Sequence, residues 1–128
     1  MRSAGVLMPI TSLPSPWGIG TLGRYAREFL DFLAESGQTY WQLLPIGPTG
    51  YGDSPYQPFS SYAGNPYLID LDDLAKVGLL LPEEYQGIQW STNPARVDYG
   101  LLYQKRFQVL KKAVDRLWAN NKQAVQCF

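Results

Sequence analysis

Hydroxyl groups, aromatic rings and a carboxylate lie close together in one glycine- and proline-rich segment near the middle of the sequence. The segment, residues 47–57, reads GPTGYGDSPYQ and contains Tyr51, Asp53, Ser54 and Tyr56. A flat aromatic ring complements the C–H face of a pyranose, and neighbouring polar groups can bind the sugar hydroxyls. Loops of this composition carry ligand sites on rigid scaffolds. We therefore predict a sugar-binding loop.

Each of these residues also has a purely structural interpretation. The carboxylate of Asp53 could equally well belong to an Asx-type turn that shapes the loop. Tyr51 and Tyr56 adjoin a glycine or a proline that exposes the ring, so for them ligand contact and packing stay equally open. Three further aromatic residues are expected to anchor the loop in the core: Phe59, Tyr62 and Tyr67.

The residue types restrict the acid–base chemistry of this chain. The sequence contains no histidine, and its single cysteine is Cys127. A Ser-His-Asp triad, a thiol–imidazolium pair and a His or Cys zinc site are therefore excluded within the chain. Glycoside cleavage needs two carboxyl groups roughly 5 to 10 Å apart, and no convincing second one accompanies Asp53. Several carboxylates fall on predicted helices, where we expect solvated or capping positions: Glu28, Asp31, Glu35, Asp72, Asp73 and Asp115.

The predicted loop follows a short apolar strand. Residues 5–8 and 40–45 are predicted to be strands buried on both faces, as parallel strands are. A helix is predicted between them over residues 22–35, with Thr21 as its N-cap and Gly37 as its left-handed end. The three elements form a βαβ unit, in which functional loops follow the carboxyl ends of the strands.

A second loop, residues 10–20, follows the first strand, so we expect both loops on the same rim. Its Trp17 is better explained as a ring that pins the loop to the domain than as a sugar contact. The sequence GIGTLG at residues 18–23 matches the G-x-G-x-x-G pattern of dinucleotide sites. However, nine residues separate Met8 from Gly18, and no acidic ribose ligand follows at the required distance. We interpret these glycines as loop and helix-entry residues.

Two more helices are predicted beyond the sugar-binding loop. Residues 70–77 form a short helix that ends at Gly78. Asp98 caps a long helix, and charged residues such as Arg106 lie mostly off its apolar stripe. The stripe is predicted at Leu102, Tyr103, Phe107, Leu110, Val114, Leu117 and Trp118.

The composition is that of one globular domain. The 128 residues are 45% hydrophobic, and eleven basic residues balance eleven acidic ones. No basic stripe is available for a phosphate backbone, so nucleic acid is not an expected partner. A single cysteine suits a reducing compartment, and no run approaches the roughly 18 to 20 apolar residues that span a bilayer. We therefore expect a soluble cytoplasmic protein without a membrane partner.

Three runs closely resemble the N-terminal part of the 4-α-glucanotransferases, also called amylomaltases or disproportionating enzymes. They are SLPSPWGIG at 12–20, YWQLLPIGPTGYGDSPYQ at 40–57 and AGNPYLI at 63–69, and VDYGLLY at 97–103 extends the match. The resemblance implies an α/β fold, the N-terminal part of a (β/α)₈ TIM barrel with a loop-rich insertion after the second strand. Residues 1–46 would be the first βαβ unit, and residues 47–128 a glucan-binding loop and helical insertion.

The resemblance also implies an activity and a set of contacts. The family transfers a segment of an α-1,4-glucan to another glucan through a covalent glycosyl-enzyme, without cofactor or metal. Ser54 and Tyr56 match donor-sugar contacts, Tyr51 and Tyr103 match aromatic residues of a second glucan-binding surface, and Asp53 helps to shape the first loop. The catalytic carboxylates of the family belong to later barrel strands and have no counterpart in these residues.

Two other interpretations stay open. The chain could be a self-sufficient carbohydrate-binding module that uses Tyr51, Tyr56 and Trp17 without chemistry. It could also belong to an α-glucan hydrolase of the same clan, because water and sugar acceptors are distinguished by details of the acceptor site. The sequence does not fix the oligomeric state.

We predict that the purified 128-residue chain does not transfer glucose units between maltotriose molecules, because the catalytic carboxylates are missing from it. We also expect poor solubility or marginal folding, since an isolated pair of parallel strands leaves edges and apolar faces uncovered. A disproportionation assay and a thermal melt check both points. Detectable transfer, or a sharp cooperative melt of the monomer, would contradict them.

Overall fold

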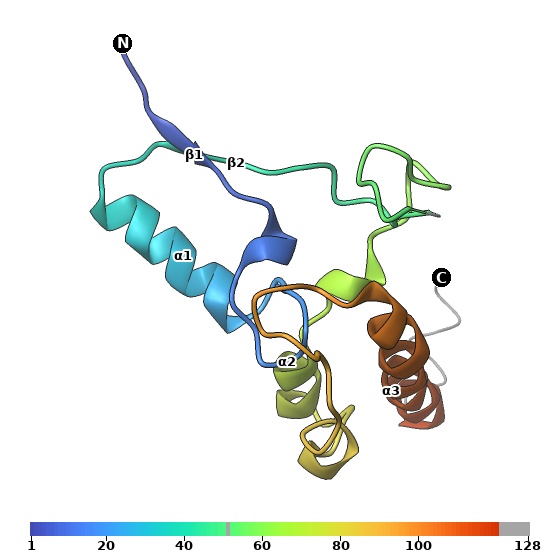
Figure 1. Ribbon diagram of the computed structural model, residues 1–128. Helices are drawn as coiled ribbons and strands as arrows, with labels where there is room; N and C mark the ends of the chain where they lie inside the picture. The colour runs from blue at the N-terminus through green and yellow to red at the C-terminus, as the bar shows by residue number, and fades with distance from the viewer. Residues whose placement is uncertain (51, 121–128) are drawn as a thin grey trace. The chain divides into compact units, whose positions relative to one another are not determined.

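The computed structural model describes residues 1–50 and 52–120, in two compact units (Figure 1). The first unit is Met1–Asp70 and the second begins at Leu71. None of the helices in the described residues is both long and apolar enough to cross a membrane.

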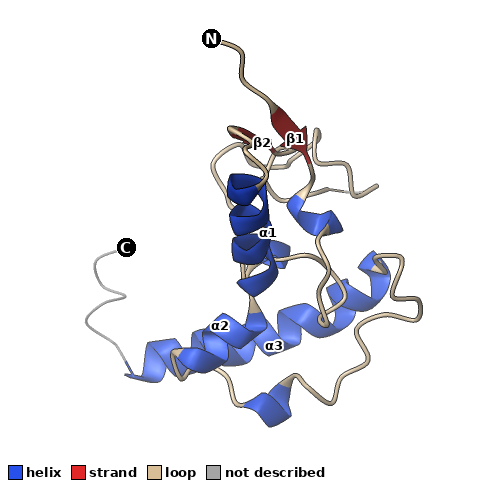
Figure 2. Ribbon diagram, turned by 90° about the vertical axis from the view of Figure 1, so that its left-hand side faces the viewer, coloured by secondary structure: helices blue, strands red, loops and turns tan. Residues whose placement is uncertain are grey.

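The first unit is built on the predicted βαβ arrangement. Strand β1 (Gly5–Leu7) is followed by helix α1 (Arg24–Glu35) and strand β2 (Tyr40–Gln42). The strands pair in parallel with Val6 opposite Trp41, and Figure 2 shows them side by side in red. The βαβ prediction is therefore confirmed, although the second strand ends before Pro45.

The prediction that both faces of the strands are buried is wrong for this structure. Alternate residues point away from the unit, and Leu7 and Tyr40 are 55% and 63% exposed. The opposite face is covered, because the Trp41 ring packs edge-on against Phe29 of α1 at 5.0 Å and its Nε1–H donates to the Met8 carbonyl at 2.8 Å. A two-stranded sheet with one helix can cover only one face.

The start of α1 also differs from the prediction. The helix begins at Arg24, its N-cap is Gly23, and no side chain caps it. Thr21 instead donates its hydroxyl hydrogen to Asp70 at 2.5 Å. The cap assignment of Thr21 is therefore wrong, because the helix begins three residues later and the Thr21 hydroxyl donates to a carboxylate distant in sequence instead of accepting from a helix N–H. Leu22, the first residue of the predicted helix, lies before the observed helix and is exposed.

The end of α1 is as predicted. Gly37 has a φ of +70°, the left-handed conformation that glycine adopts without steric cost. The Gln38 N–H donates to the Leu33 carbonyl at 2.9 Å and the Gly37 N–H to the Ala34 carbonyl at 3.1 Å. These two bonds make a Schellman motif.

The core of the first unit lies beside α1. Ile10, Leu13, Ala26 and Leu68 form its buried cluster, and three half-buried residues pack against it: Met8, Phe29 and Trp41. Trp17 is buried, as its structural interpretation predicts. The loop after β1 is therefore held to the body of the unit by its own apolar residues.

The second unit contains helices α2 (Leu71–Lys76) and α3 (Tyr99–Asn120). The predicted glycine stop after α2 and the predicted aspartate cap of α3 are both confirmed. Gly78, with a φ of +79°, follows α2, and the Leu101 N–H at the start of α3 donates to the Asp98 carboxylate at 3.0 Å.

The buried face of α3 is rotated from the predicted stripe. Arg106, which we expected mostly off the stripe, is fully buried, and its guanidinium lies 5.9 Å over the Trp90 ring. An arginine can be buried in this way because its planar cation stacks on an aromatic face. The other buried residues of α3 are Leu102, Val109, Leu110 and Ala113, whereas Tyr103, Phe107, Val114, Leu117 and Trp118 are exposed.

An ion pair in the second unit holds α3 to the segment before it. Arg116 donates to both carboxylate oxygens of Glu84, at 2.9 and 3.0 Å, and to the Leu79 carbonyl at 2.6 Å. The Leu81 N–H also donates to Glu84, at 2.8 Å. The hydrogen bonds from Arg116 and Leu81 lower the pKa of the Glu84 carboxyl from 4.5 to about 2.

We predict that Glu84→Gln weakens the second unit at neutral pH but not in strong acid. A carboxyl whose pKa is lowered by folding contributes stability above its unfolded pKa near 4.5, and this is lost as the pH falls toward about 2. Amide hydrogen exchange in α3 should therefore be faster in the variant at pH 6 and equal to wild type near pH 2. Glu83→Gln, the matched control, should show no difference. Equal exchange of the Glu84 variant and wild type at pH 6 would contradict the prediction.

Candidate functional site

The loop beyond β2 is closed at its base by a short neck. The N–H of Asn65 donates to the carbonyl of Ile46 at 3.1 Å, which joins the two ends of the loop. The Asn65 side chain then accepts from the Tyr67 N–H at 3.0 Å and caps the 3-10 helix Pro66–Leu68. Tyr67 and Leu68 are buried, so this turn anchors the loop in the unit. Figure 1 shows the loop, in green, between β2 and this turn.

A tight turn presents three of the predicted site residues. Asp53 has a φ of +56°, and its N–H donates to the Gly50 carbonyl at 3.2 Å. The Ser54 hydroxyl accepts from the Tyr56 N–H at 3.3 Å. The Tyr56 ring is 68% exposed, so the turn holds the backbone while leaving the ring accessible. Asp53 is thus part of the turn, and its contact with sugar stays a prediction.

The same pattern recurs six residues further along. The Ser60 hydroxyl accepts from the N–H groups of Tyr62 and Ala63, at 3.4 and 3.3 Å. Tyr62 is fully exposed and Phe59 is 77% exposed. The prediction that these two rings anchor the loop is wrong, because the neck and Tyr67 provide the anchor. The prediction for Tyr67 is confirmed.

The other two predicted site residues are not placed with this turn. Tyr51 lies outside the described residues. Tyr103 lies on α3 in the second unit, where it is 69% exposed and its ring packs edge-on against Phe107 at 5.6 Å. The structure therefore brings together Asp53, Ser54 and Tyr56 within one turn, and describes Tyr103 in a separate unit.

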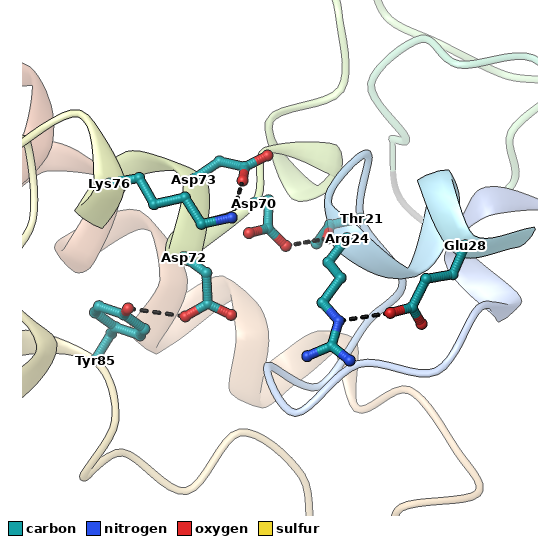
Figure 3. Close-up of polar contacts among 8 residues, drawn as sticks. All are labelled: Thr21, Arg24, Glu28, Asp70, Asp72, Asp73, Lys76 and Tyr85. Atoms are coloured by element: carbon teal, nitrogen blue, oxygen red, sulfur yellow. Dashed lines mark hydrogen bonds and ion pairs between the residues drawn. The ribbon is translucent and has the colours of Figure 1, made fainter.

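Three of the carboxylates on the helices have side-chain partners. Glu28 accepts from Arg24 at 2.6 Å, and the Tyr85 hydroxyl donates to Asp72 at 2.9 Å (Figure 3). Asp73 pairs with Lys76 at 3.2 Å. In residues 47–65 the sequence has Asp53 as its single carboxylate, so this loop holds no acid–base pair. Across the described ranges, no group of three His, Cys, Asp or Glu side chains is arranged to hold a metal.

The sequence interpretation missed the pair formed by Thr21 and Asp70. Each was assigned to a helix start, and the two are 49 residues apart in the sequence. The small residue at Gly23 was the available signal, because it permits the close approach of another segment. The pair connects the start of α1 with the residues that end the loop.

The first unit is an α/β unit, in which a helix joins two parallel strands and a loop rich in polar and aromatic residues follows the second strand. Proteins of this class carry their ligand-binding loops at the ends of the strands. A family model described as 4-alpha-glucanotransferase matches residues 8–128. The chain belongs to the 4-alpha-glucanotransferase family.

Individual relatives agree with this assignment. The chain is 57% identical over 112 residues to the 4-alpha-glucanotransferase of Thermus thermophilus, covering 88% of this chain and 21% of the relative. It is 53% identical over 106 residues to the enzyme of Clostridium butyricum, covering 83% of this chain and 22% of that enzyme. A solved amylomaltase from Streptococcus agalactiae, in complex with acarbose, is 48% identical and superposes with a TM-score of 0.94. That match covers 98% of this chain and 26% of the amylomaltase.

The chain thus spans between a fifth and roughly a quarter of the length of these relatives. The similarity covers nearly all of this chain, so the residues described above belong to the shared part of the fold.

We predict that Asp53→Ala destabilises the turn by about 1 kcal/mol and that Asp53→Gly does not, because alanine is strained at a positive φ and glycine is not. Amide exchange at position 53 should be faster in the alanine variant alone. Equal protection in both variants would contradict the turn assignment. Asp53→Gly also keeps the turn without the carboxylate, so a loss of glucan binding in it would assign the carboxylate to the sugar.

Proposed function

We propose that this chain is the glucan-binding part of a 4-α-glucanotransferase, which moves a segment of an α-1,4-glucan to another glucan or to glucose by a retaining covalent mechanism. The observation that carries the proposal is the exposed Tyr56 ring on a turn fixed by Ser54, within the loop that follows the parallel strand β2. The family to which the chain belongs supports the same function.

The turn has the groups that a glucose unit needs. The exposed Tyr56 ring can stack on the C–H face of the sugar while its hydroxyl stays in water. The Ser54 oxygen accepts from the Tyr56 N–H, so its own hydrogen is free to be donated to a sugar hydroxyl. We propose Ser54 and Tyr56 as donor-sugar contacts, with Asp53 as an acceptor beside them.

A second aromatic surface is proposed for the same substrate. Tyr103 is exposed on α3, and its ring is steadied by Phe107. Tyr51 adjoins the turn in the sequence. From the family resemblance we assign each of them to glucan binding away from the bond that is cleaved. The Streptococcus agalactiae amylomaltase in complex with acarbose supports sugar binding as the task of this fold.

We infer that the bond-breaking carboxylates reside in polypeptide outside these residues. β1, α1 and β2 would be the first elements of a (β/α)₈ barrel over residues 1–46, and residues 47–128 an insertion with the glucan-binding loop. Glycoside transfer needs two carboxyl groups, and the loop contains Asp53 alone. No cofactor is required by this chemistry. The single cysteine of the sequence suits a cytoplasmic enzyme.

A non-catalytic glucan-binding module is the second candidate, favoured by the lack of a carboxylate pair in the loop. A hydrolase of the same clan would share the binding contacts and differ in using water as acceptor. Product analysis separates these three, since transfer gives longer glucans, hydrolysis gives only shorter ones, and a module gives neither.

We predict that a chimera regains transfer when this chain replaces the matching quarter of the Streptococcus agalactiae amylomaltase. In this chimera Tyr56→Ala should raise the KM for maltotriose about tenfold, because an aromatic contact with sugar is lost. Tyr25→Ala on α1 is the control, since the Tyr25 ring lies under the Arg24 guanidinium and is not one of the proposed sugar contacts. Disproportionation of maltotriose, followed by glucose release and chromatography, gives the measurement. A folded chimera without transfer, or an unchanged KM in Tyr56→Ala, would overturn the assignment.

A further inference from the structure

We propose that Asp70 is a positioning residue for the glucan-binding loop, acting through the start of α1 rather than by touching sugar. The contacts involved join Thr21, Leu22 and Gly23 to Leu68 and Asp70, and we call this set the Asp70 clamp. The inference rests on the proposed function, because it assigns the clamp to the orientation of Ser54 and Tyr56.

The clamp contains one side-chain bond and one backbone bond. The Thr21 hydroxyl donates to Asp70 Oδ2 at 2.5 Å, and Thr21 is only 5% exposed (Figure 3). The Leu22 N–H donates to the Leu68 carbonyl at 2.8 Å. Hydrogen bonds to an ionised carboxylate are shorter and stronger than neutral ones, so this contact is directional as well as stabilising.

Close packing fixes the same geometry. A Cβ atom at Gly23 would come within 2.2 Å of Asp70 Oδ2 and 2.8 Å of the Asp70 Cβ. The whole side chain of Asp70 therefore rests against the backbone that begins α1. A carboxylate in this place is also favoured by the positive end of the helix dipole.

The clamp connects the far ends of both loops that leave the strand pair. The loop after β1 ends at Gly20, whose N–H donates to the Thr11 carbonyl at 3.2 Å, and Thr21 follows directly. The loop after β2 returns through Asn65 and reaches Asp70 five residues later. Because both loops start at the ends of paired strands, the clamp fixes their opposite ends relative to each other.

Apolar packing alone would not supply this orientation. The buried cluster of Ile10, Leu13, Ala26 and Leu68 stabilises the same region by burial, which has no preferred direction. The bond from Thr21 to Asp70 fixes one atom against another. The clamp should therefore affect how sugar is held more than whether the unit folds.

The test compares two changes at Thr21 in the amylomaltase chimera. Thr21→Val keeps the shape and removes the hydroxyl, whereas Thr21→Ser keeps the hydroxyl. We expect Thr21→Val and Asp70→Asn to raise the KM for maltotriose about tenfold with kcat within about twofold, and Thr21→Ser to restore wild-type values. Leu33→Ala, buried in α1, controls for stability, because it should lower the melting temperature without changing the KM.

A second measurement is made on the folded amylomaltase chimera. Thr21→Val should increase amide hydrogen exchange at Leu22 and at Asn65, because the bond that holds both loop ends is lost. If the KM of an active chimera is the same in Thr21→Val and wild type, or rises equally in Leu33→Ala, the positioning role is overturned while the proposed function stands. Unchanged exchange at Leu22 and Asn65 would also overturn it. An inactive but folded chimera with wild-type Thr21 would instead count against the proposed function.

Discussion

The arrangement of the strands and the helix in the first unit depends on the contacts of the Trp41 indole ring. Trp41 lies on β2, packs edge-on against Phe29 of α1, and donates its ring N–H to the Met8 carbonyl just beyond β1. One side chain thus joins all three elements of the βαβ unit. Strands of only three residues have few backbone bonds of their own, so their alignment relies on this packing. The packing of Trp41 therefore also sets where the two loops beyond the strands begin.

The sequence pattern predicted the order of elements, the end of α1 and the start of α3, because all of these depend on local chemistry, whereas the predicted start of α1 was wrong. Gly37 ends α1 and Asp98 caps α3 with the bonds expected of those residue types. Burial was predicted less well. Apolar residues in a strand show that a face is suited to being covered, but they do not say what covers it. In the described residues α1 covers one face, so Leu7 and Tyr40 remain exposed on the other.

The candidate site was predicted from the types of its residues, but its internal geometry could not be predicted from the sequence. Asp53, Ser54 and Tyr56 do share one turn, since neighbours in sequence within a tight loop must lie close together. The roles of Phe59 and Arg106 were misjudged from polarity alone. An apolar ring on a loop held at its neck need not be buried, and a guanidinium can be buried when it stacks on Trp90.

The contact between Asp70 and the backbone at Gly23 makes substitutions at these two positions depend on each other. A side chain at position 23 would collide with the Asp70 side chain, so even alanine would force Asp70 to shift. Shortening residue 70 would make room but would leave the buried Thr21 hydroxyl without its acceptor. The residues at positions 21, 23 and 70 are therefore coupled, so a change at one of them alters the effect of a change at another. This coupling follows from geometry alone, and it would constrain the evolution of the region whatever the loop binds.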